Sequence, residues 1–195
     1  MADSLEQHPA PVDRARAERA VVDLLAALGD DVGRPGLTRT PQRVVDLFTG
    51  LLRGMHADPC SALGVPIPLD EAEPPGSLVG LSAIPFRSVC EHHLLPFDGY
   101  ADVYYSPRLR LAGLSKIATL VEAASGRLTL QETIARSLAD TIMKVLDPYG
   151  VVVRLRGTHR CVGQLEPQAA GSTAVSLVTI GSLPDVSAHL LNTEN

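Results

Sequence analysis

Two short segments carry the residues best suited to chemistry. Cys90-Glu91-His92-His93 places a thiol and an imidazole three residues apart, and His159-Arg160-Cys161 adds another of each. Thiolate and imidazole together are typical zinc ligands. Cys90, His93 and Cys161 provide three good ligands, and no further Cys follows at the spacing of a zinc finger. Three protein ligands and one open position are typical of catalytic zinc, which lowers the pKa of a bound water to near neutrality.

Two histidines remain beside the predicted zinc ligands. We expect His92 and His159 to carry protons to and from a reacting group. Glu91, between Cys90 and His92, is a further candidate catalytic residue. Plainer interpretations stay open, in which His159 is a buried core histidine and His92 orients a zinc ligand.

Composition narrows the class of protein. The 195 residues suffice for one domain, and no apolar run reaches the length of a membrane span. A net charge of -5 argues against a general nucleic-acid-binding surface. The polar, acidic N-terminus does not resemble a signal peptide. Three cysteines, an odd number, suit a reducing compartment, so we expect a cytoplasmic protein in which Cys60 is a plain thiol.

The N-terminal part is predicted to be helical. We expect a disordered tail at 1–12 and a region of helices and a loop at 13–76. Apolar spacing predicts a helix from Val12 to Leu28, and a second helix with Thr40 as N-cap and Pro41 as first residue, running to about Leu52. Residues 59–75, rich in proline and acidic residues, are predicted to form a long loop.

The remaining chain predicts an α+β catalytic domain at 77–183, followed by a tail at 184–195. Strand patterns occur near 78–84, 99–105, 151–156 and 173–179, and helical patterns near 115–124 and 130–146. Thr129 and Glu132 form a capping-box pattern, which gives Glu132 a structural interpretation. This order predicts helices on one face of an antiparallel sheet.

The motifs together resemble GTP cyclohydrolase I. They occur in the family's order and at its spacing: Cys-Glu-His-His-Leu-Leu-Pro-Phe at 90–97, Gly-Leu-Ser-Lys-Ile-Ala at 113–118, Gln131-Glu132, and His159-Arg160-Cys161. The match extends to Thr-Pro-Gln-Arg at 40–43 and to Ser172-Thr173, and covers roughly residues 38 to 182. The joint pattern is far more specific than any one motif.

The resemblance implies a tunnelling fold, in which the sheets of several subunits join into a ring-shaped barrel. Members are commonly homodecamers with active sites between subunits. They open the imidazole ring of GTP by adding zinc-activated water at C8, release formate, and form a pterin-type product. A guanine nucleotide or related purine is therefore the expected substrate, and Zn²⁺ the expected cofactor.

The resemblance also implies roles for individual residues. Those expected to hold zinc are Cys90, His93 and Cys161, and those expected to move protons are His92 and His159. The expected substrate-binding residues are Glu132 with Gln131 at the guanine edge, Ser115 and Lys116 on the sugar and phosphate side, and Arg43. Taken alone, Lys116 would be an ordinary solvated side chain.

Three departures from the family fall at positions that serve the triphosphate. Leu165 replaces an Arg four residues after Cys161, Thr119 an Arg three residues after Lys116, and Asp46 a Lys three residues after Arg43. If the chain at 161–165 is a strand, Leu165 shares a face with Cys161. Three charge-assisted hydrogen bonds would together contribute on the order of 5–9 kcal/mol if independent, and half of that is about a thousandfold in affinity.

Other arginines are candidates to replace the missing cations. Arg160 lies between His159 and Cys161, so strand alternation would direct it to the opposite face. Arg108, Arg110 and Arg127 lie in or next to predicted loops. The pattern favours retained chemistry and guanine recognition, with a weakened triphosphate site.

Two functional hypotheses follow. The first is a zinc-dependent cyclohydrolase acting on GTP or on a guanine compound with fewer phosphates. The second is a catalytically silent paralogue that binds a purine or regulates an active enzyme. A related tunnelling-fold reductase of deazapurines would need a nucleophilic Cys in another context and a nicotinamide site, and the sequence shows neither.

Overall fold

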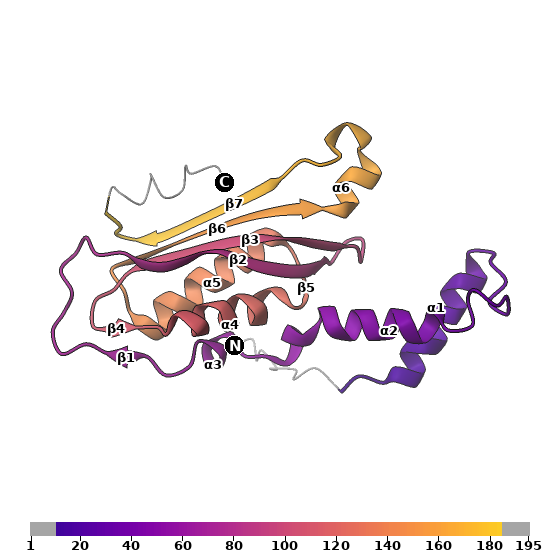
Figure 1. Ribbon diagram of the computed structural model, residues 1–195, viewed down its shortest axis with the longest axis horizontal. Coiled ribbons are helices and arrows are strands. Elements are labelled where there is room, and N and C mark those ends of the chain that lie inside the picture. Colours follow the sequence, from indigo (N-terminus) through magenta and orange to yellow (C-terminus); the bar gives the residue numbers. More distant parts are fainter. Residues whose placement is uncertain (1–10, 185–195) are drawn as a thin grey trace, which may run out of the picture.

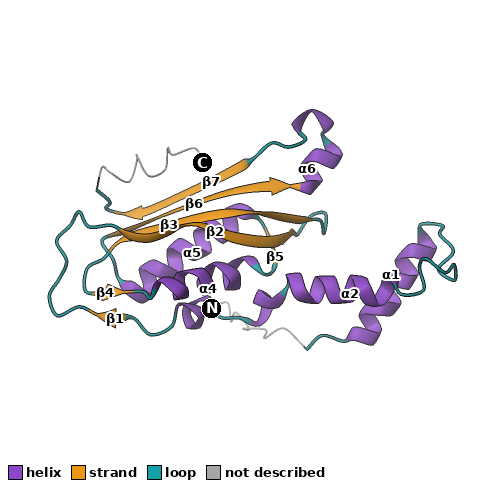
Figure 2. Cartoon of the chain, viewed as in Figure 1, coloured by secondary structure: helices purple, strands orange, loops and turns teal. Residues whose placement is uncertain are grey.

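The computed structural model describes residues 11–184 of the chain. Most of the two predicted tails, at 1–10 and 185–195, lies outside the described residues. The described part is an α+β structure in which a five-stranded sheet carries helices on one face (Figures 1 and 2). The predicted α+β class is confirmed. No helix within 11–184 is long and apolar enough to cross a membrane.

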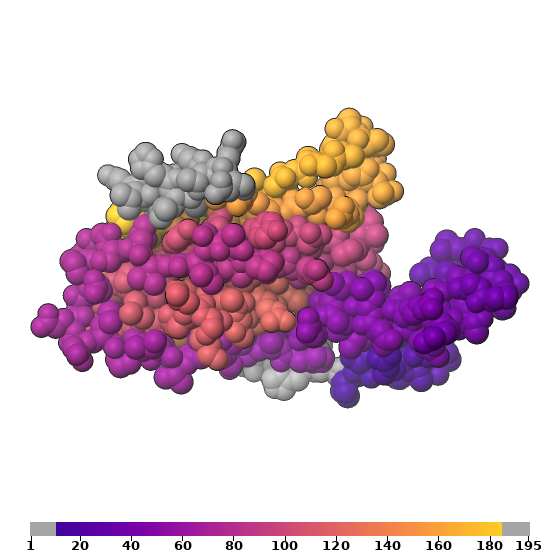
Figure 3. Space-filling model, in the orientation of Figure 1, coloured from indigo at the N-terminus to yellow at the C-terminus, as the bar shows by residue number. Residues whose placement is uncertain are grey.

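Helices α1 (Arg14–Ala27) and α2 (Thr40–Leu51) form an arm that projects from the sheet domain (Figures 1 and 3). Thr40 was predicted to be the N-cap of α2, but Arg39 occupies that position and Thr40 is the first helical residue. The helix begins one residue earlier than predicted because the Arg43 amide donates to the Arg39 carbonyl, at 3.2 Å. Pro41 is then the second helical residue, where its missing N–H costs little.

The predicted loop at 59–75 is partly structured. It contains a short helix α3 (Pro59–Leu63), which follows η1 (Arg53–His56), and a strand β1 (Ile67–Pro68) that pairs with β4 (Arg110–Leu111). Asp58 begins α3, because its carboxylate accepts from the amides of Cys60 and Ser61 at 3.1 and 3.0 Å. Leu63 is fully buried in the core, which fixes the helix against the domain.

The sheet has the order β5-β2-β3-β6-β7, antiparallel except for the short parallel pairing of β5 with β2. Its strands are β2 (Val79–Cys90), β3 (Pro96–Ser106), β5 (Leu128–Thr129), β6 (Gly150–His159) and β7 (Ala174–Gly181). Strands β2, β3 and β6 are longer than predicted. As a consequence β2 ends at Cys90 and β6 ends at His159.

Helices α4 (Leu114–Ser125) and α5 (Gln131–Leu146) cover one face of the sheet, as predicted (Figure 1). Alternate residues of the central strands point into this layer, in agreement with the period of a strand. The core formed there includes Ala101, Val103, Tyr105, Val151, Val153 and Leu155 from the sheet, and Ile117, Leu120, Leu138 and Ile142 from the helices.

The capping box predicted at the start of α5 does not form. Leu130 occupies the N-cap position without a side-chain hydrogen bond, and the Thr129 hydroxyl donates to the Leu130 carbonyl at 3.4 Å. Thr129 belongs to β5 and pairs with Cys90, so its backbone is committed to the sheet. The structural interpretation of Glu132 therefore fails, and its carboxylate is available for another role.

The segment after His159, for which strand geometry was considered, is instead the helix α6 (Arg160–Leu165), followed by η2 (Pro167–Ala169). The ladder of β6 with β7 ends at Gly157 and Ala174, so the chain beyond it has no strand to pair with on that side. Residues four apart also share a helix face, so Leu165 still lies on the side of Cys161. Its side chain is 62% exposed.

Tyr105 provides a test of how the core positions the start of α4. It is fully buried, and its hydroxyl accepts a hydrogen bond from the Ala112 amide at 2.9 Å. Replacing Tyr105 by Phe leaves this buried amide without a partner, so we expect the free energy of unfolding to fall by about 1–3 kcal/mol in urea titrations. The control Tyr100→Phe, at a 53% exposed position, should change it by less than about 0.5 kcal/mol. Equal effects would contradict this account.

Candidate metal centre and the histidines beside it

The register of β3 brings the two chemical segments together. Pro96 pairs with Val89 of β2, and the next residue, Phe97, pairs with His159 of β6. Cys90 and His159 therefore end their strands at the same edge of the sheet, and Cys161 follows at the start of α6.

A tight turn between β2 and β3 returns His93 to Cys90. The Cys90 amide donates to the Leu95 carbonyl, and the Leu94 amide donates to the Cys90 carbonyl, both at 2.9 Å. Leu94 has a positive φ of 55°, which few non-glycine residues adopt. The turn leaves Cys90 Sγ 3.7 Å from His93 Nδ1.

Cys90, His93 and Cys161 form a group that could hold a metal ion. Their ligand atoms all lie within 4.8 Å of one another, and both thiols are buried while His93 is exposed. Ligands about 2.0–2.3 Å from a tetrahedral zinc lie within about 4 Å of each other, so the group needs only a small adjustment to bind one. Burial, reinforced by the neighbouring Cys90, raises the pKa of the Cys161 thiol. A bound cation would offset both effects, so the residues fit zinc.

His159 lies against Phe97 beside this group. The two rings stack with centroids 4.3 Å apart and planes inclined by 12°. Burial lowers the pKa of His159, and the nearby Glu132 carboxylate opposes that shift. Since the ordinary histidine pKa is about 6.5, His159 is neutral at pH 7. The role of Phe97 was missed in the sequence, although Phe97 closes the motif at 90–97.

His92 and Glu91 lie on the exposed side of the turn. His92 Nε2 is 3.8 Å from Glu91 Oε1, and both side chains are about half exposed or more. The His92 ring is perpendicular to that of His93, with centroids 6.1 Å apart.

Gln131 and Glu132, adjacent in the sequence, are in different surroundings. Glu132 is exposed at the second position of α5, close enough to His159 to influence its charge. Gln131 is only 1% exposed, and its amide contacts His159, Leu155, Ala174 and Ser176. In this arrangement the Gln131 side chain has no group left to offer to a purine.

Ser115, Lys116 and Arg43 do not lie beside the metal-binding group of the same chain. The C-terminal end of α4 is the end near the group, because Arg127 accepts at its carbonyl from the Val89 amide. Ser115 lies about three turns, or about 15 Å, back along the helix. The Lys116 chain instead packs near Gly64 after α3. Arg43 is exposed on α2 in the projecting arm.

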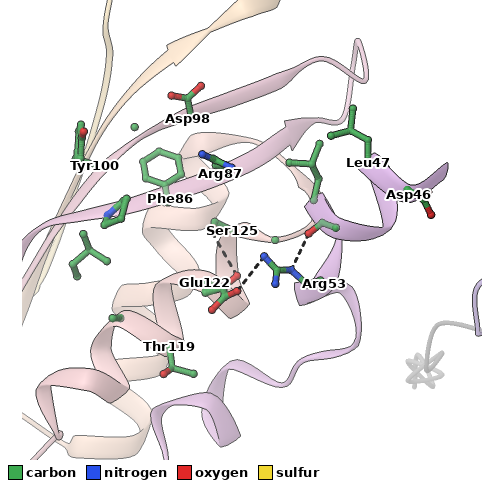
Figure 4. Close-up of a pocket in the computed structure, with 17 residues that line it drawn as sticks. Asp46, Leu47, Arg53, Phe86, Arg87, Asp98, Tyr100, Thr119, Glu122 and Ser125 are labelled. Carbon is green, nitrogen blue, oxygen red and sulfur yellow. Dashed lines mark hydrogen bonds and ion pairs between the residues drawn. The ribbon is translucent and has the colours of Figure 1, made fainter. Parts of the chain in front are cut away.

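Asp46 and Thr119 are two of the three positions that depart from the family. Both line one cavity of about 840 Å³ between the arm, α4, β2 and β3 (Figure 4). The metal-binding residues and Leu165 do not line it. Asp46 forms an ion pair with Arg14 of α1, and the Thr119 hydroxyl donates to the Ser115 carbonyl at 2.9 Å. Arg53, in the same cavity, lies 3.7 Å from Glu122.

The arginines considered as replacements already have partners in this chain. Arg160 pairs with Asp98 at 3.7 Å, Arg108 with Asp147 at 3.5 Å, and Arg110 donates to a carbonyl of α5 at 3.2 Å. Arg127 has the most partners of the four, because its Nη2 donates to three carbonyl oxygens, those of Gly54, Ala57 and Ala123.

Two thiols, an imidazole and a neutral histidine at one sheet edge are the components of a hydrolytic metal centre. Comparison with known proteins identifies the family to which the chain belongs. The family model of GTP cyclohydrolase I matches residues 17–192. The GTP cyclohydrolase 1 of Leifsonia xyli subsp. xyli is 40% identical over 177 residues, which is 91% of this chain and 92% of that protein. The GTP cyclohydrolase 1 of Bacillus cytotoxicus is 40% identical over 175 residues, 89% and 90% of the two chains.

The chain therefore belongs to the GTP cyclohydrolase I family, a family of hydrolases, as the motifs predicted. Among solved structures, the apo form of the archaeosine synthase QueF-Like aligns with a TM-score of 0.47 at 22% identity. That alignment covers 57% of this chain and all of that chain. The likeness is too weak to support any further conclusion.

The metal-binding group predicts a selective loss of metal on substitution. We expect the purified protein to bind one zinc ion per chain, and Cys161→Ser to lower its affinity at least about a hundredfold, since removing even a residue behind the ligands costs 10–100-fold. Metal analysis and competition with a chromogenic chelator measure this. Cys60→Ser, in α3, is the matched control and should bind zinc normally. Equal zinc content in the two variants would exclude Cys161 as a ligand.

Proposed function

We propose that this protein opens the imidazole ring of a guanine nucleotide at C8 and releases C8 as formate, leading to a pterin-type product. The observation that supports this most directly is the convergence of Cys90, His93 and Cys161 with a neutral His159, in a chain 40% identical to a GTP cyclohydrolase 1 over most of its length. Zinc held by the three ligands would supply a Lewis acid that activates water near neutral pH.

The proposed reaction needs more than one proton carrier. Releasing C8 as formate consumes two water molecules and breaks both links between C8 and nitrogen. N7 gains two protons and N9 gains one, and the fourth proton of the two waters leaves with formic acid. His159 is neutral and therefore able to accept a proton from water. His92, which lies 3.8 Å from Glu91, is the second proposed proton carrier and would donate to a departing nitrogen.

Glu132 is proposed to bind the guanine edge. A carboxylate can accept hydrogen bonds from the ring N–H and the amino group of guanine at the same time. Glu132 is exposed, has no capping role, and lies close to His159. A purine bound there would have its imidazole ring within reach of the metal-binding group.

We assign the remaining substrate contacts to a neighbouring subunit. Ser115, Lys116 and Arg43 lie on α4 and α2, away from the metal-binding group of their own chain. A tunnelling fold, in which β5 and β7 at the free sheet edges adjoin other copies in a ring, commonly a decamer, would place these three residues at the site of the next subunit.

Three unpaired cysteines in the described chain fit a reducing cytoplasm as the location of the protein.

A shared site predicts complementation between inactive variants. His159→Ala and Lys116→Ala should each be inactive, but co-assembled in equal amounts they should recover about a quarter of the wild-type activity, because a quarter of the sites combine the intact halves. Differently tagged, co-expressed chains allow mixed rings to be isolated and assayed. The control pair His159→Ala and Cys161→Ser, in which both changes damage the same half of the shared site, should recover no activity. No recovery in the first pair would place the whole site within one chain.

The proposed substrate has fewer phosphates than GTP. The positions that serve the triphosphate in the family are Asp46, Thr119 and Leu165, and all three are exposed. Asp46 adds a negative charge that would repel phosphate, although Arg14 partly offsets it. The arginines considered as replacements for the missing cations are engaged elsewhere in the chain.

A nucleotide series tests the function and the substrate together. Zinc-loaded protein is incubated with GTP, GDP, GMP and guanosine, while formate and pterin fluorescence are measured. We expect formate release, with a higher kcat/KM for GMP or guanosine than for GTP. Leu165→Arg should raise kcat/KM for GTP by at least about tenfold, the equivalent of one charge-assisted hydrogen bond, without a gain for guanosine.

Leu165→Gln is the uncharged control for this series and should leave the preference unchanged. The best turnover with GTP would show that the three substitutions are compensated. Absence of formate from every guanine compound would refute the proposed activity, and tight purine binding without turnover would favour a silent, regulatory paralogue.

A further inference from the structure

The Gln131 amide makes more contacts than any other side-chain amide among residues 11–184. Its nitrogen lies 3.3 Å from the Leu155 carbonyl oxygen, 3.1 Å from that of Ala174, and 3.1 Å from the Ser176 hydroxyl. Its oxygen lies 3.1 Å from His159 Nε2. The side chain thus joins the start of α5 to both β6 and β7, next to the candidate metal centre.

The orientation of this amide follows from its neighbours. Carbonyl oxygens can only accept hydrogen bonds, so the amide nitrogen must face Leu155 and Ala174. The exchanged orientation would place three oxygens together and lose both bonds. Gln131 Oε1 therefore faces His159, and it can only accept.

That orientation selects one form of the histidine. Because Gln131 Oε1 only accepts, His159 Nε2 must carry the hydrogen that lies between them. With the hydrogen on Nε2, the lone pair of the ring lies on Nδ1. The stack on Phe97 fixes the plane of the ring, so both its tautomer and its orientation are set by the fold.

The backbone leaves room for this contact at Gly157. A Cβ at residue 157 would lie 2.4 Å from Gln131 Oε1, which is closer than real Cβ contacts. Gly157 precedes His159 by two residues on β6 and pairs with Ala174 of β7. A side chain there would displace the amide oxygen from the histidine.

We propose that Gln131 is a positioning residue that holds His159 as the Nε2–H tautomer and keeps Nδ1 as its proton-accepting nitrogen. This replaces the expectation that the Gln131 side chain reads the guanine edge, and leaves that task to Glu132. The inference rests on the proposed role of His159 as a proton carrier.

The tautomer is measured first on the unmodified, zinc-loaded protein. Solid-state NMR of protein labelled with ¹⁵N in its histidine rings distinguishes the two neutral tautomers, and His159→Gln identifies the signal of His159. We expect the hydrogen on Nε2. A hydrogen on Nδ1 overturns the inference whatever the variants do. The measurement needs no turnover, so its outcome is separate from that of the formate assay.

Variants then test the consequence for catalysis. Gln131→Met removes the acceptor with little change in volume, and we expect mixed tautomers and a kcat about 10–100-fold lower, with KM within about twofold and normal zinc content. Gln131→Glu should restore part of kcat, because a carboxyl buried between two carbonyls is protonated and can still accept from His159. A raised KM with unchanged kcat in Gln131→Met would instead assign Gln131 to purine binding and overturn the inference.

Two further variants serve as a control for the Gln-to-Met change and as a second way to displace the amide oxygen. Gln168→Met, the same change at an exposed position, should leave kcat and the tautomer unaltered. Gly157→Ala displaces the amide oxygen without removing it and should reproduce the tautomer change if Gln131→Met fails to fold. An unchanged Nε2–H signal and full kcat in a folded Gln131→Met would exclude the positioning role.

Discussion

The candidate site depends on the register of β3 with the strands on its two sides. The pairs Val89–Pro96 and Phe97–His159 align the ends of β2 and β6 at one edge of the sheet. A slip of one residue in either ladder would turn the paired side chain to the opposite face. The metal-binding group and His159 are therefore placed by the same central strand, β3, that contributes to the core.

Residue type and spacing predicted the chemistry well, because they are properties of short segments. The approach of Cys90, His93 and Cys161 followed from ligand type and motif, and the α+β class followed from periodicity. The wrong local predictions share one cause. In each case the local structure depends on contacts with residues that are distant in the sequence. Thr129 pairs with Cys90 instead of capping α5, Leu63 enters the core and orders a predicted loop, and the chain after His159 becomes helical where its ladder ends.

The neighbours of the site were the hardest part to predict. Gln131 and Glu132 are adjacent in sequence, yet the first is buried between two strands and the second is exposed. A helix turns by 100° per residue, so adjacent residues face different surroundings. Which of the two faces the protein interior depends on how α5 packs against β6 and β7, and a single sequence contains no direct signal for that.

The residues proposed for the chemistry and those at the family's phosphate-binding positions lie on different kinds of element. The metal-binding group and His159 lie where buried strands end, and His159 is tied there to the sheet register, to the stack on Phe97 and to the amide of Gln131. Asp46, Thr119 and Leu165 are exposed positions on three helices, where substitutions usually change stability by less than about 0.5 kcal/mol. The fold therefore permits these three exposed positions to change without disturbing the metal-binding group, as the proposed function requires.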